Sequence, residues 1–284
     1  MPPRNHKTFT LLSIGQRGVG KTVFLAASCS RTRPDRARPF WFECRNLESQ
    51  ERIDKLLNYM VRTGEYPPAT ASISSFYFTL QGRGVFGRRT LCHFRWQDVP
   101  GEICHQQSAA FQELTWASHG CCIFFDAQAL LHEEGYFEKT ADIRDQALTI
   151  ARLAAFNHLR YPFAIVLTKC DQLQASDPYA ALQQKLQVFV EQLQALGSQC
   201  RGFLSGVNIR TQAAESTIEV QHAAEAFVWL ASEIYAAERD GWAQAMSRWL
   251  AGLIGGKTAL PLEPGVLEKL LVPPTQQSVP IKTR

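Results

Sequence analysis

The 284-residue sequence lacks any apolar run near the ~18 residues that a membrane-spanning helix needs. It also lacks a large excess of one charge, because 30 Lys and Arg residues against 26 Asp and Glu residues leave a formal net charge of +4. Such a small excess does not require a polyanionic partner, so we expect no nucleic-acid partner. From the missing apolar run we expect no transmembrane segment. The composition, 45% hydrophobic and 20% charged, excludes collagen-like, coiled-coil and wholly disordered chains.

The eight cysteines include no C-x-x-C pair, and no histidine stands near them at a metal-ligand spacing. This pattern does not indicate a zinc site or a disulfide framework. In a chain of this length we expect the cysteines to be small buried side chains in a reducing compartment. The sequence therefore predicts a cytoplasmic protein.

Short apolar segments alternate along the chain with segments of helical periodicity. We predict strands at 8–14, 73–81, 89–97, 120–125, 163–168 and 201–205, and helices at 21–30, 53–64, 142–157, 176–196 and 217–238. A Gly-rich segment between the second and third strands predicts a hairpin. The whole pattern predicts an α/β fold with a doubly wound, mostly parallel sheet of six main strands and helices on both faces.

Residues 15–22, GQRGVGKT, match the phosphate-binding pattern G-x-x-x-x-G-K-[ST]. Glycines let the backbone wrap a phosphate with its N–H groups, Lys21 would reach the outer phosphates, and Thr22 would offer a hydroxyl to Mg²⁺. An ordinary glycine turn is the alternative, but the position between a predicted strand and a predicted helix favours the phosphate loop. The predicted phosphate-binding residues are Gly15, Gly18, Val19, Gly20, Lys21, Thr22 and Val23.

The tetrapeptide Asp98-Val99-Pro100-Gly101 follows the predicted strand at 89–97. A carboxylate at a strand tip beside the phosphate loop can hold Mg²⁺, directly or through water, and the Gly101 N–H can meet a γ-phosphate. Taken alone, D-x-P-G is also a good turn. Its place after a phosphate loop favours the nucleotide-binding role.

The segment Thr168-Lys169-Cys170-Asp171 ends the apolar strand at 163–168. An aspartate here can accept hydrogen bonds from N1–H and the 2-amino group of guanine, a donor pair that adenine lacks, and the Lys169 stem can lie along the purine face. The motif therefore predicts GTP rather than ATP. A solvated loop, with an ATP-dependent enzyme, is the alternative, but nucleotides bind at the carboxyl ends of strands in open α/β sheets.

The ordered series GQRGVGKT, DVPG, TKCD and Leu204-Ser205-Gly206 resembles the signature of GTPases of the translation-factor-related (TRAFAC) class, which includes the Ras-like switches. The resemblance covers about residues 8–236 and implies a P-loop NTPase fold of the Ras-like type. It also implies that Ser205 and Gly206 belong to the guanine site, with the Gly206 backbone near the guanine carbonyl. A plain turn is the alternative for Gly206.

Two finer features, GVGKTVFLAA and the segment Tyr66-Pro67-Pro68-Ala69-Thr70 ahead of a strand, resemble the bacterial "double-GTPase" subgroup. Its members are thought to act with partner proteins in prokaryotic signalling or conflict systems. The resemblance implies that Thr70 senses Mg²⁺ and the γ-phosphate, and that protein partners, a second copy or other system components contact the switch loops. A capping or loop threonine is the alternative for Thr70.

Two departures from the Ras-like pattern bear on hydrolysis. Glu102 stands where those enzymes place a water-orienting Gln, and its negative charge beside a γ-phosphate is unfavourable, which predicts slow turnover. Arg17 could stabilise transition-state charge, but we favour a solvent-facing side chain. The predicted catalytic residues are Lys21, Thr70, Gly101 and Glu102, and the predicted metal ligands are Thr22, Asp98 and Thr70. A GTP-binding scaffold with little hydrolysis is the alternative.

The segment between Lys21 and Asp98 is longer than in minimal Ras-like domains, so the resemblance places an insertion at about 31–66. We expect this insertion to carry partner specificity. We predict a GTPase domain over 1–238, an amphipathic helix over 239–256, and a Pro-containing, largely extended or disordered tail over 257–284. We expect the helix to pack on the domain itself rather than on a partner or a membrane.

Overall fold

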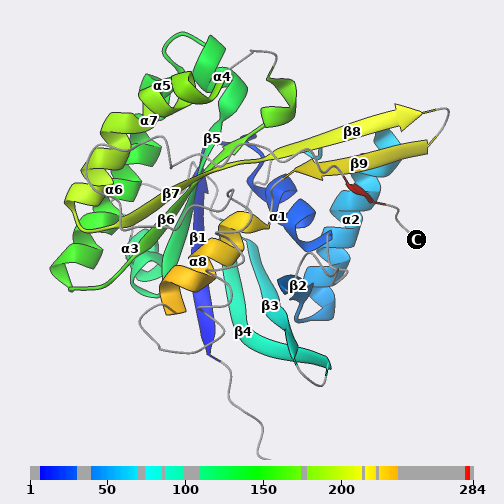
Figure 1. The fold of residues 1–284 in the computed structure, drawn as a ribbon, viewed down its shortest axis with the longest axis horizontal. Helices are drawn as coiled ribbons and strands as arrows, with labels where there is room; N and C mark the ends of the chain where they lie inside the picture. The colour runs from blue at the N-terminus through cyan, green and yellow to red at the C-terminus, as the bar shows by residue number, and fades with distance from the viewer. Residues whose placement is uncertain are drawn as a thin grey trace, which may run out of the picture.

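The computed structural model describes residues 7–30, 40–68, 74–84, 87–98, 109–173, 178–212, 215–221, 224–235 and 279–281. These residues form a seven-stranded mixed sheet with helices on both faces, together with a separate three-stranded sheet (Figure 1). The predicted α/β class, with helices on both faces of the sheet, is confirmed. No helix in the described part of the chain combines the length and hydropathy that crossing a bilayer requires.

The central sheet has the strand order β2-β3-β4-β1-β5-β6-β7. The strands are β1 (Thr8–Gly15), β2 (Phe40–Cys44), β3 (Ser74–Gly84), β4 (Gly87–Asp98), β5 (Gly120–Asp126), β6 (Pro162–Thr168) and β7 (Gln199–Leu204). The pairings from β4 through β1, β5 and β6 to β7 are parallel, whereas β2 pairs with β3 and β3 with β4 in antiparallel fashion. The predicted hairpin is therefore confirmed, but the predicted count of six strands was wrong.

The seventh strand is β2, which lies inside the predicted insertion. It holds five residues and pairs along its whole length with β3. Its sequence FWFEC is mostly aromatic and does not alternate regularly between apolar and polar residues. Its pairing with β3 therefore identifies it as a strand. The insertion thus extends the central sheet at the edge beyond the β3–β4 hairpin.

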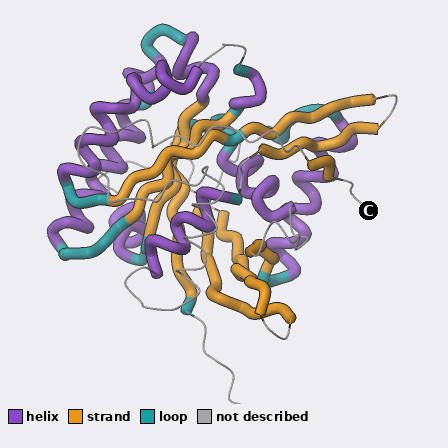
Figure 2. The backbone as a smooth tube through the Cα atoms, viewed as in Figure 1, coloured by secondary structure: helices purple, strands orange, loops and turns teal. Residues whose placement is uncertain are grey.

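Helices cover the two faces of the sheet in two groups (Figure 2). One face carries α1 (Lys21–Ser30), α2 (Leu47–Thr63) and α8 (Glu225–Tyr235). The other face carries α3 (Ala109–Trp116), α4 (Ala127–His132), α5 (Tyr136–Lys139), α6 (Ala141–Phe156) and α7 (Pro178–Ala195). Successive residues of β1 alternate between the two hydrophobic cores, since Leu11 packs in one and Leu12 in the other. The predicted helices at 142–157 and 176–196 are confirmed as α6 and α7.

The three-stranded sheet contains β8 (Gly206–Gln212), β9 (Glu215–Gln221) and β10 (Val279–Ile281) in the order β10-β9-β8. We predicted a helix from 217, and that was wrong for its first part because this segment pairs with β8 and places Ile218 and Val220 in the core at period two. The helix α8 begins only at Glu225. The described part of the predicted tail, β10, pairs with β9, and the predicted helix 239–256 lies outside the described residues.

Candidate functional site

The predicted phosphate loop connects the end of β1 to the start of α1. Gly15 has no room for a side chain, because a Cβ atom there would lie 2.9 Å from the Phe124 Cβ and 3.0 Å from the Phe124 carbonyl oxygen. Gly18 and Gly20 adopt φ angles of 74° and 98°, which side chains strongly disfavour. These glycines fold the chain so that the amino end of α1, which is the positive end of the helix dipole, faces the cavity described below.

Lys21 is folded back across this loop. Its Nζ donates hydrogen bonds to the carbonyl oxygens of Gly15 at 2.8 Å and Gln16 at 3.1 Å, and the residue is only 8% exposed. The ammonium charge is therefore held on the inner side of the loop, beside the helix amino end. Both features attract an anion to the same place.

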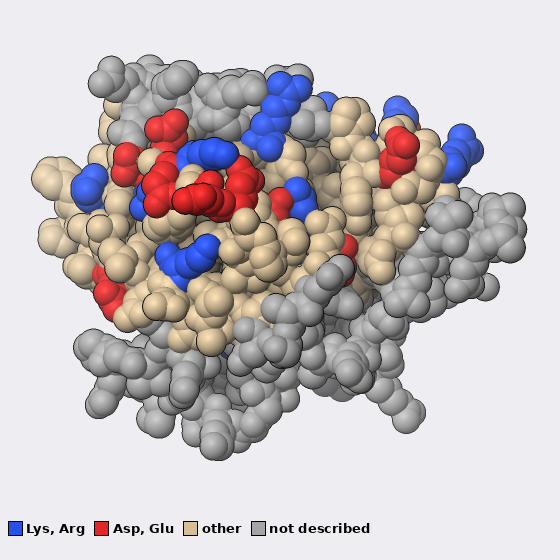
Figure 3. All heavy atoms as spheres, turned by 90° about the horizontal axis from the view of Figure 1, so that it is seen from above, with Lys and Arg blue, Asp and Glu red and all other residues tan. Residues whose placement is uncertain are grey.

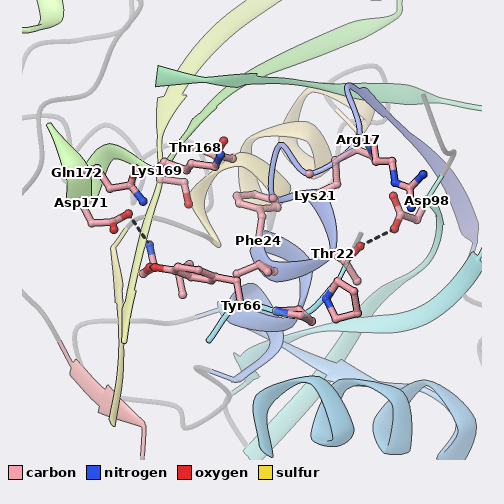
Figure 4. Close-up of a pocket in the computed structure, with 17 residues that line it drawn as sticks. Arg17, Lys21, Thr22, Phe24, Tyr66, Asp98, Thr168, Lys169, Asp171 and Gln172 are labelled. Carbon is pink, nitrogen blue, oxygen red and sulfur yellow. Dashed lines mark hydrogen bonds between the residues drawn. The ribbon is translucent and has the colours of Figure 1, made fainter. Parts of the chain in front are cut away.

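Asp98 ends β4 next to the phosphate loop, because β4 and β1 run parallel and pair Asp98 with Ser13. The Thr22 hydroxyl donates to Asp98 Oδ2 at 2.8 Å, and the Ser13 hydroxyl lies 3.4 Å from Oδ1. Asp98 is 1% exposed. Arg17 is exposed to solvent, as predicted, and in Figure 4 its side chain lies beside Asp98. The sequence analysis missed Ser13, which only the register of β1 against β4 identifies.

The donor set formed by Thr22 and Asp98 fits Mg²⁺. The Thr22 hydroxyl donates its hydrogen bond to Asp98, so the lone pairs of its oxygen can face a cation. Both residues supply the oxygen ligands that Mg²⁺ prefers. The described residues contain no group of three or more His, Cys, Asp or Glu side chains that could hold a metal ion. Mg²⁺ in nucleotide sites typically takes one or two protein ligands together with phosphate oxygens, so this pair is sufficient.

Two predicted segments, 168–171 and 204–206, meet at the other end of the sheet's carboxyl edge. The Cys170 N–H donates to the Ser205 carbonyl at 3.1 Å, and the Ser205 N–H donates to the Leu167 carbonyl at 2.7 Å. A Cβ atom on Gly206 would lie 3.0 Å from the Asp171 nitrogen, so a larger residue would displace Asp171. The structure therefore brings together Asp171, Ser205 and Gly206, as the resemblance implied.

Asp171 lies in a short 3₁₀ turn, Cys170–Gln172, and its Oδ1 accepts a hydrogen bond from the Val207 N–H at 3.2 Å. Burial raises the pKa of Asp171, and hydrogen bonds from the backbone together with the Lys169 charge oppose that rise. Burial favours the neutral acid, whereas donors that point at the carboxylate favour its charged form. A ligand that offers further N–H donors would stabilise the carboxylate.

Thr168 and Lys169 are both engaged with the protein itself. The Thr168 hydroxyl donates to the Val19 carbonyl at 2.6 Å and lies 3.1 Å from the Phe125 carbonyl, which ties the phosphate loop to the sheet. Lys169, with φ of 57°, forms an ion pair with Asp126, and Asp126 Oδ1 also caps α4 by accepting from the Ala129 N–H at 3.0 Å. The sequence analysis missed Asp126, although its place at a strand end was a signal.

A single cavity of about 260 Å³ joins the two ends of the site (Figure 4). Thr22 and Asp98 lie on one side of it and Lys169 and Asp171 on the opposite side. The predicted residues that line it are Gly18, Gly20, Lys21, Thr22, Val23, Asp98, Thr168, Lys169, Asp171 and Ser205. Gly15, Val19 and Gly206 do not line the cavity but belong to the same segments as residues that do. The motifs that were separated by about half of the chain thus face one space.

Other lining residues had no assigned role in the sequence analysis. They are Phe24, Tyr66, Pro67, Pro68, Gln172 and Val207. Tyr66 follows α2, and its hydroxyl donates to the Val207 carbonyl at 2.6 Å. Burial, together with the nearby Asp171 charge, raises the pKa of Tyr66 to about 12. From the sequence, Tyr66 was noted only as part of the segment that resembles the double-GTPase subgroup.

Several predicted residues lie outside the described part of the chain: Thr70, Gly101 and Glu102. Their roles at the γ-phosphate remain predictions. Figure 3 shows one face of the molecule, on which Lys and Arg side chains stand singly and beside Asp and Glu side chains. This face of the described residues carries no continuous basic stripe of the kind that follows a nucleic-acid backbone.

No protein-family model matches this sequence, and no curated protein matches it with significant similarity. The function of the site is therefore argued from its own residues and geometry.

Proposed function

We propose that this protein is a guanine-nucleotide-binding switch of the P-loop type, which binds GTP with Mg²⁺ and hydrolyses it slowly to GDP. One observation carries the proposal: a phosphate loop and a carboxylate suited to guanine lie at opposite ends of the same cavity. The parallel strands β4, β1, β5 and β6 support it, because nucleotides bind at the carboxyl edge of such sheets. The TRAFAC class and the double-GTPase subgroup are part of the same proposal.

At the phosphate end, the loop N–H groups and the Lys21 ammonium would receive the β- and γ-phosphates. Lys21 already donates to two loop carbonyls, so it can exchange one of these for a phosphate oxygen without moving far. Thr22 and Asp98 would hold Mg²⁺, which when bound neutralises phosphate charge. Asp98 would also orient the Thr22 hydroxyl through their hydrogen bond.

At the base end, Asp171 would accept the N1–H and 2-amino donors of guanine. The Val207 N–H holds one carboxylate oxygen and so fixes the plane of the acid before a base arrives. Adenine presents an acceptor at N1, and its lone pair would meet the negatively charged carboxylate. This mismatch gives a physical reason for guanine preference.

The switching part of the proposal concerns Thr70 and Gly101, which would sense the γ-phosphate, and Glu102, which would position water poorly. Loss of the γ-phosphate would release two loops and change which protein partners bind. We propose that these partners, or a second copy of the chain, act in the cytoplasm.

Asp171→Asn tests the proposal directly. We expect the variant to lose about 100-fold in GTP affinity, because one carboxylate acceptor is replaced by an N–H donor and the remaining acceptor loses its charge. We also expect it to gain affinity for xanthosine triphosphate, whose 2-carbonyl can accept from an amide. Calorimetric titration of GTP, ATP and xanthosine triphosphate measures all three affinities. Asp145→Asn, an exposed aspartate on α6, is the matched control. An unchanged preference for GTP in Asp171→Asn would contradict the assignment.

A second candidate is a GTP-binding scaffold that barely hydrolyses its nucleotide. It is favoured by the carboxylate of Glu102 in place of a water-orienting amide, while the predicted binding residues that the structure describes lie around one cavity. Single-turnover hydrolysis with and without Mg²⁺ separates the two candidates. Tight GTP binding without phosphate release over hours would favour the scaffold.

A further inference from the structure

The base end of the cavity is lined by Tyr66, Pro67 and Pro68, which follow the helix α2, and by Val207 of β8, the first strand of the hairpin β8–β9 (Figure 1). The two pack on each other, since Ile53 and Met60 of α2 share one hydrophobic core with Ile218 and Val220 of β9. They come from distant parts of the chain. A contact between the end of α2 and β8 therefore lies at the wall of the cavity.

Such a contact exists at the end of α2. The helix stops at Gly64, whose left-handed φ of 69° turns the chain toward the cavity, and Tyr66 follows two residues later. Pro67 and Pro68, which fix their own φ angles and lack N–H donors, continue the chain along the lining. This short connection holds the Tyr66 ring at the cavity wall.

The Tyr66 hydroxyl and Asp171 are bound by the same residue of β8. Tyr66 donates to the Val207 carbonyl at 2.6 Å, and the Val207 N–H donates to Asp171 Oδ1 at 3.2 Å. One residue thus connects the end of α2 to the carboxylate proposed to bind the base. With a pKa of about 12, Tyr66 keeps its proton at neutral pH and remains a donor.

We propose that the hydrogen bond between Tyr66 and Val207 is a latch that controls the rate of nucleotide exchange, and that opening it separates α2 from β8 at the mouth of the guanine site. This inference rests on the proposed function. Tyr66 acts here as a positioning residue through Val207. A protein partner that moves α2 against the β8–β9 hairpin would accelerate exchange, which assigns a regulatory role to the insertion.

The latch has a distinctive kinetic signature. The bond joins two protein groups. On this proposal it forms in both the free and the bound protein, and it breaks whenever a nucleotide enters or leaves. Its removal therefore accelerates both steps and leaves the equilibrium affinity nearly unchanged. A direct contact with the nucleotide would instead alter dissociation and affinity together.

Tyr66→Phe, measured by stopped-flow binding and chase of fluorescent GDP and GTP, tests the inference. We expect association and dissociation rate constants to rise together by about fivefold, the change that corresponds to about 1 kcal/mol for one hydrogen bond, with Kd within about twofold of wild type. Tyr59→Phe, which alters an exposed tyrosine of α2, is the matched control and should exchange at wild-type rates. Tyr66→Ala, which also removes the ring from the cavity wall, should in addition raise Kd.

The outcomes separate the two proposals. If the wild-type protein binds no guanine nucleotide, the proposed function and the latch both fail. If it binds and Tyr66→Phe exchanges at wild-type rates, only the latch fails. A rise in dissociation alone, with a matching rise in Kd, would also overturn the latch, because it would show that the hydroxyl contacts the nucleotide directly.

Discussion

Replacing Thr22 by Val is the sharpest test of the phosphate end of the site. The substitution keeps the shape of the side chain but exchanges a hydroxyl for a methyl group. Two consequences can be separated, because the hydroxyl both donates to Asp98 and is the predicted Mg²⁺ ligand. Thr22→Ser, which keeps the hydroxyl, is the matched control.

The first consequence is a loss of stability without any nucleotide. Asp98 is 1% exposed, so its carboxylate cannot replace the lost donor with bulk water, and the Ser13 hydroxyl at 3.4 Å is a weak substitute. A hydrogen bond to a charged group contributes about 1.5–3 kcal/mol to the free energy of unfolding. At about 2–4 °C per kcal/mol for a domain of this size, we expect the thermal midpoint of Thr22→Val to fall by roughly 3–12 °C.

The second consequence concerns Mg²⁺. The Kd for GTP should be lower with Mg²⁺ than with a chelator in the wild-type protein, and Thr22→Val should lose about 10- to 100-fold of this gain. Affinity in the chelator should change little, because Lys21 and the loop N–H groups remain. Calorimetric titration of GTP under both conditions gives the two Kd values for each variant.

The result that would refute this reasoning is a Thr22→Val protein whose ratio of the two Kd values equals that of the wild type. Thr22 would then not be a metal ligand, whatever its effect on stability. A fall in the thermal midpoint without any loss of the Mg²⁺ gain would restrict Thr22 to orienting Asp98.

Two further predictions follow from pKa shifts. Burial raises the pKa of Asp171, and a protonated carboxyl loses an acceptor. On acidification the preference for GDP over ADP should therefore begin to fall at a pH above the 3.8 typical of an aspartate. Titrations of both nucleotides from pH 7 downward measure this preference, and a preference that stays constant to pH 4 would contradict the prediction. A hydrogen bond from Cys29 lowers the pKa of the Cys44 thiol, whereas burial raises the pKa of Cys170 to about 12. Iodoacetamide at pH 8 should therefore modify Cys44 before Cys170. Peptide mass spectrometry detects the order of labelling, and equal labelling of the two would argue against the shift.

Local sequence predicted the strands that are covered on both faces. In β5 and β6 the apolar run extends to the residue before the last one of the strand, and six of seven and seven of seven residues respectively are buried. The phosphate loop was equally predictable, since the strand, the glycines and the helix are adjacent in the chain. Asp98 and Asp171 were placed in the site because the carboxyl ends of parallel strands meet at one edge of a sheet.

Local sequence failed where pairing decided the structure. Residues 217–221 were assigned to the start of a helix, but β8 supplies their hydrogen-bond partners and the core accepts Ile218 and Val220 on one face. β2 was missed because its pairing with β3 involves residues more than thirty positions away. The ion pair of Lys169 with Asp126 and the bond of Tyr66 to Val207 were missed for the same reason.

The sequence by itself determined the chemistry that we propose for the site: a glycine loop for phosphate, a threonine and an aspartate for a cation, and an aspartate that can accept from guanine. These depend on residue types within short segments. Only the tertiary structure decided that the ends of α2 and β8 meet over the base end, because that contact depends on how two segments about 140 residues apart pack on one sheet. Close packing of side chains is a property of the assembled core, and no local pattern encodes it.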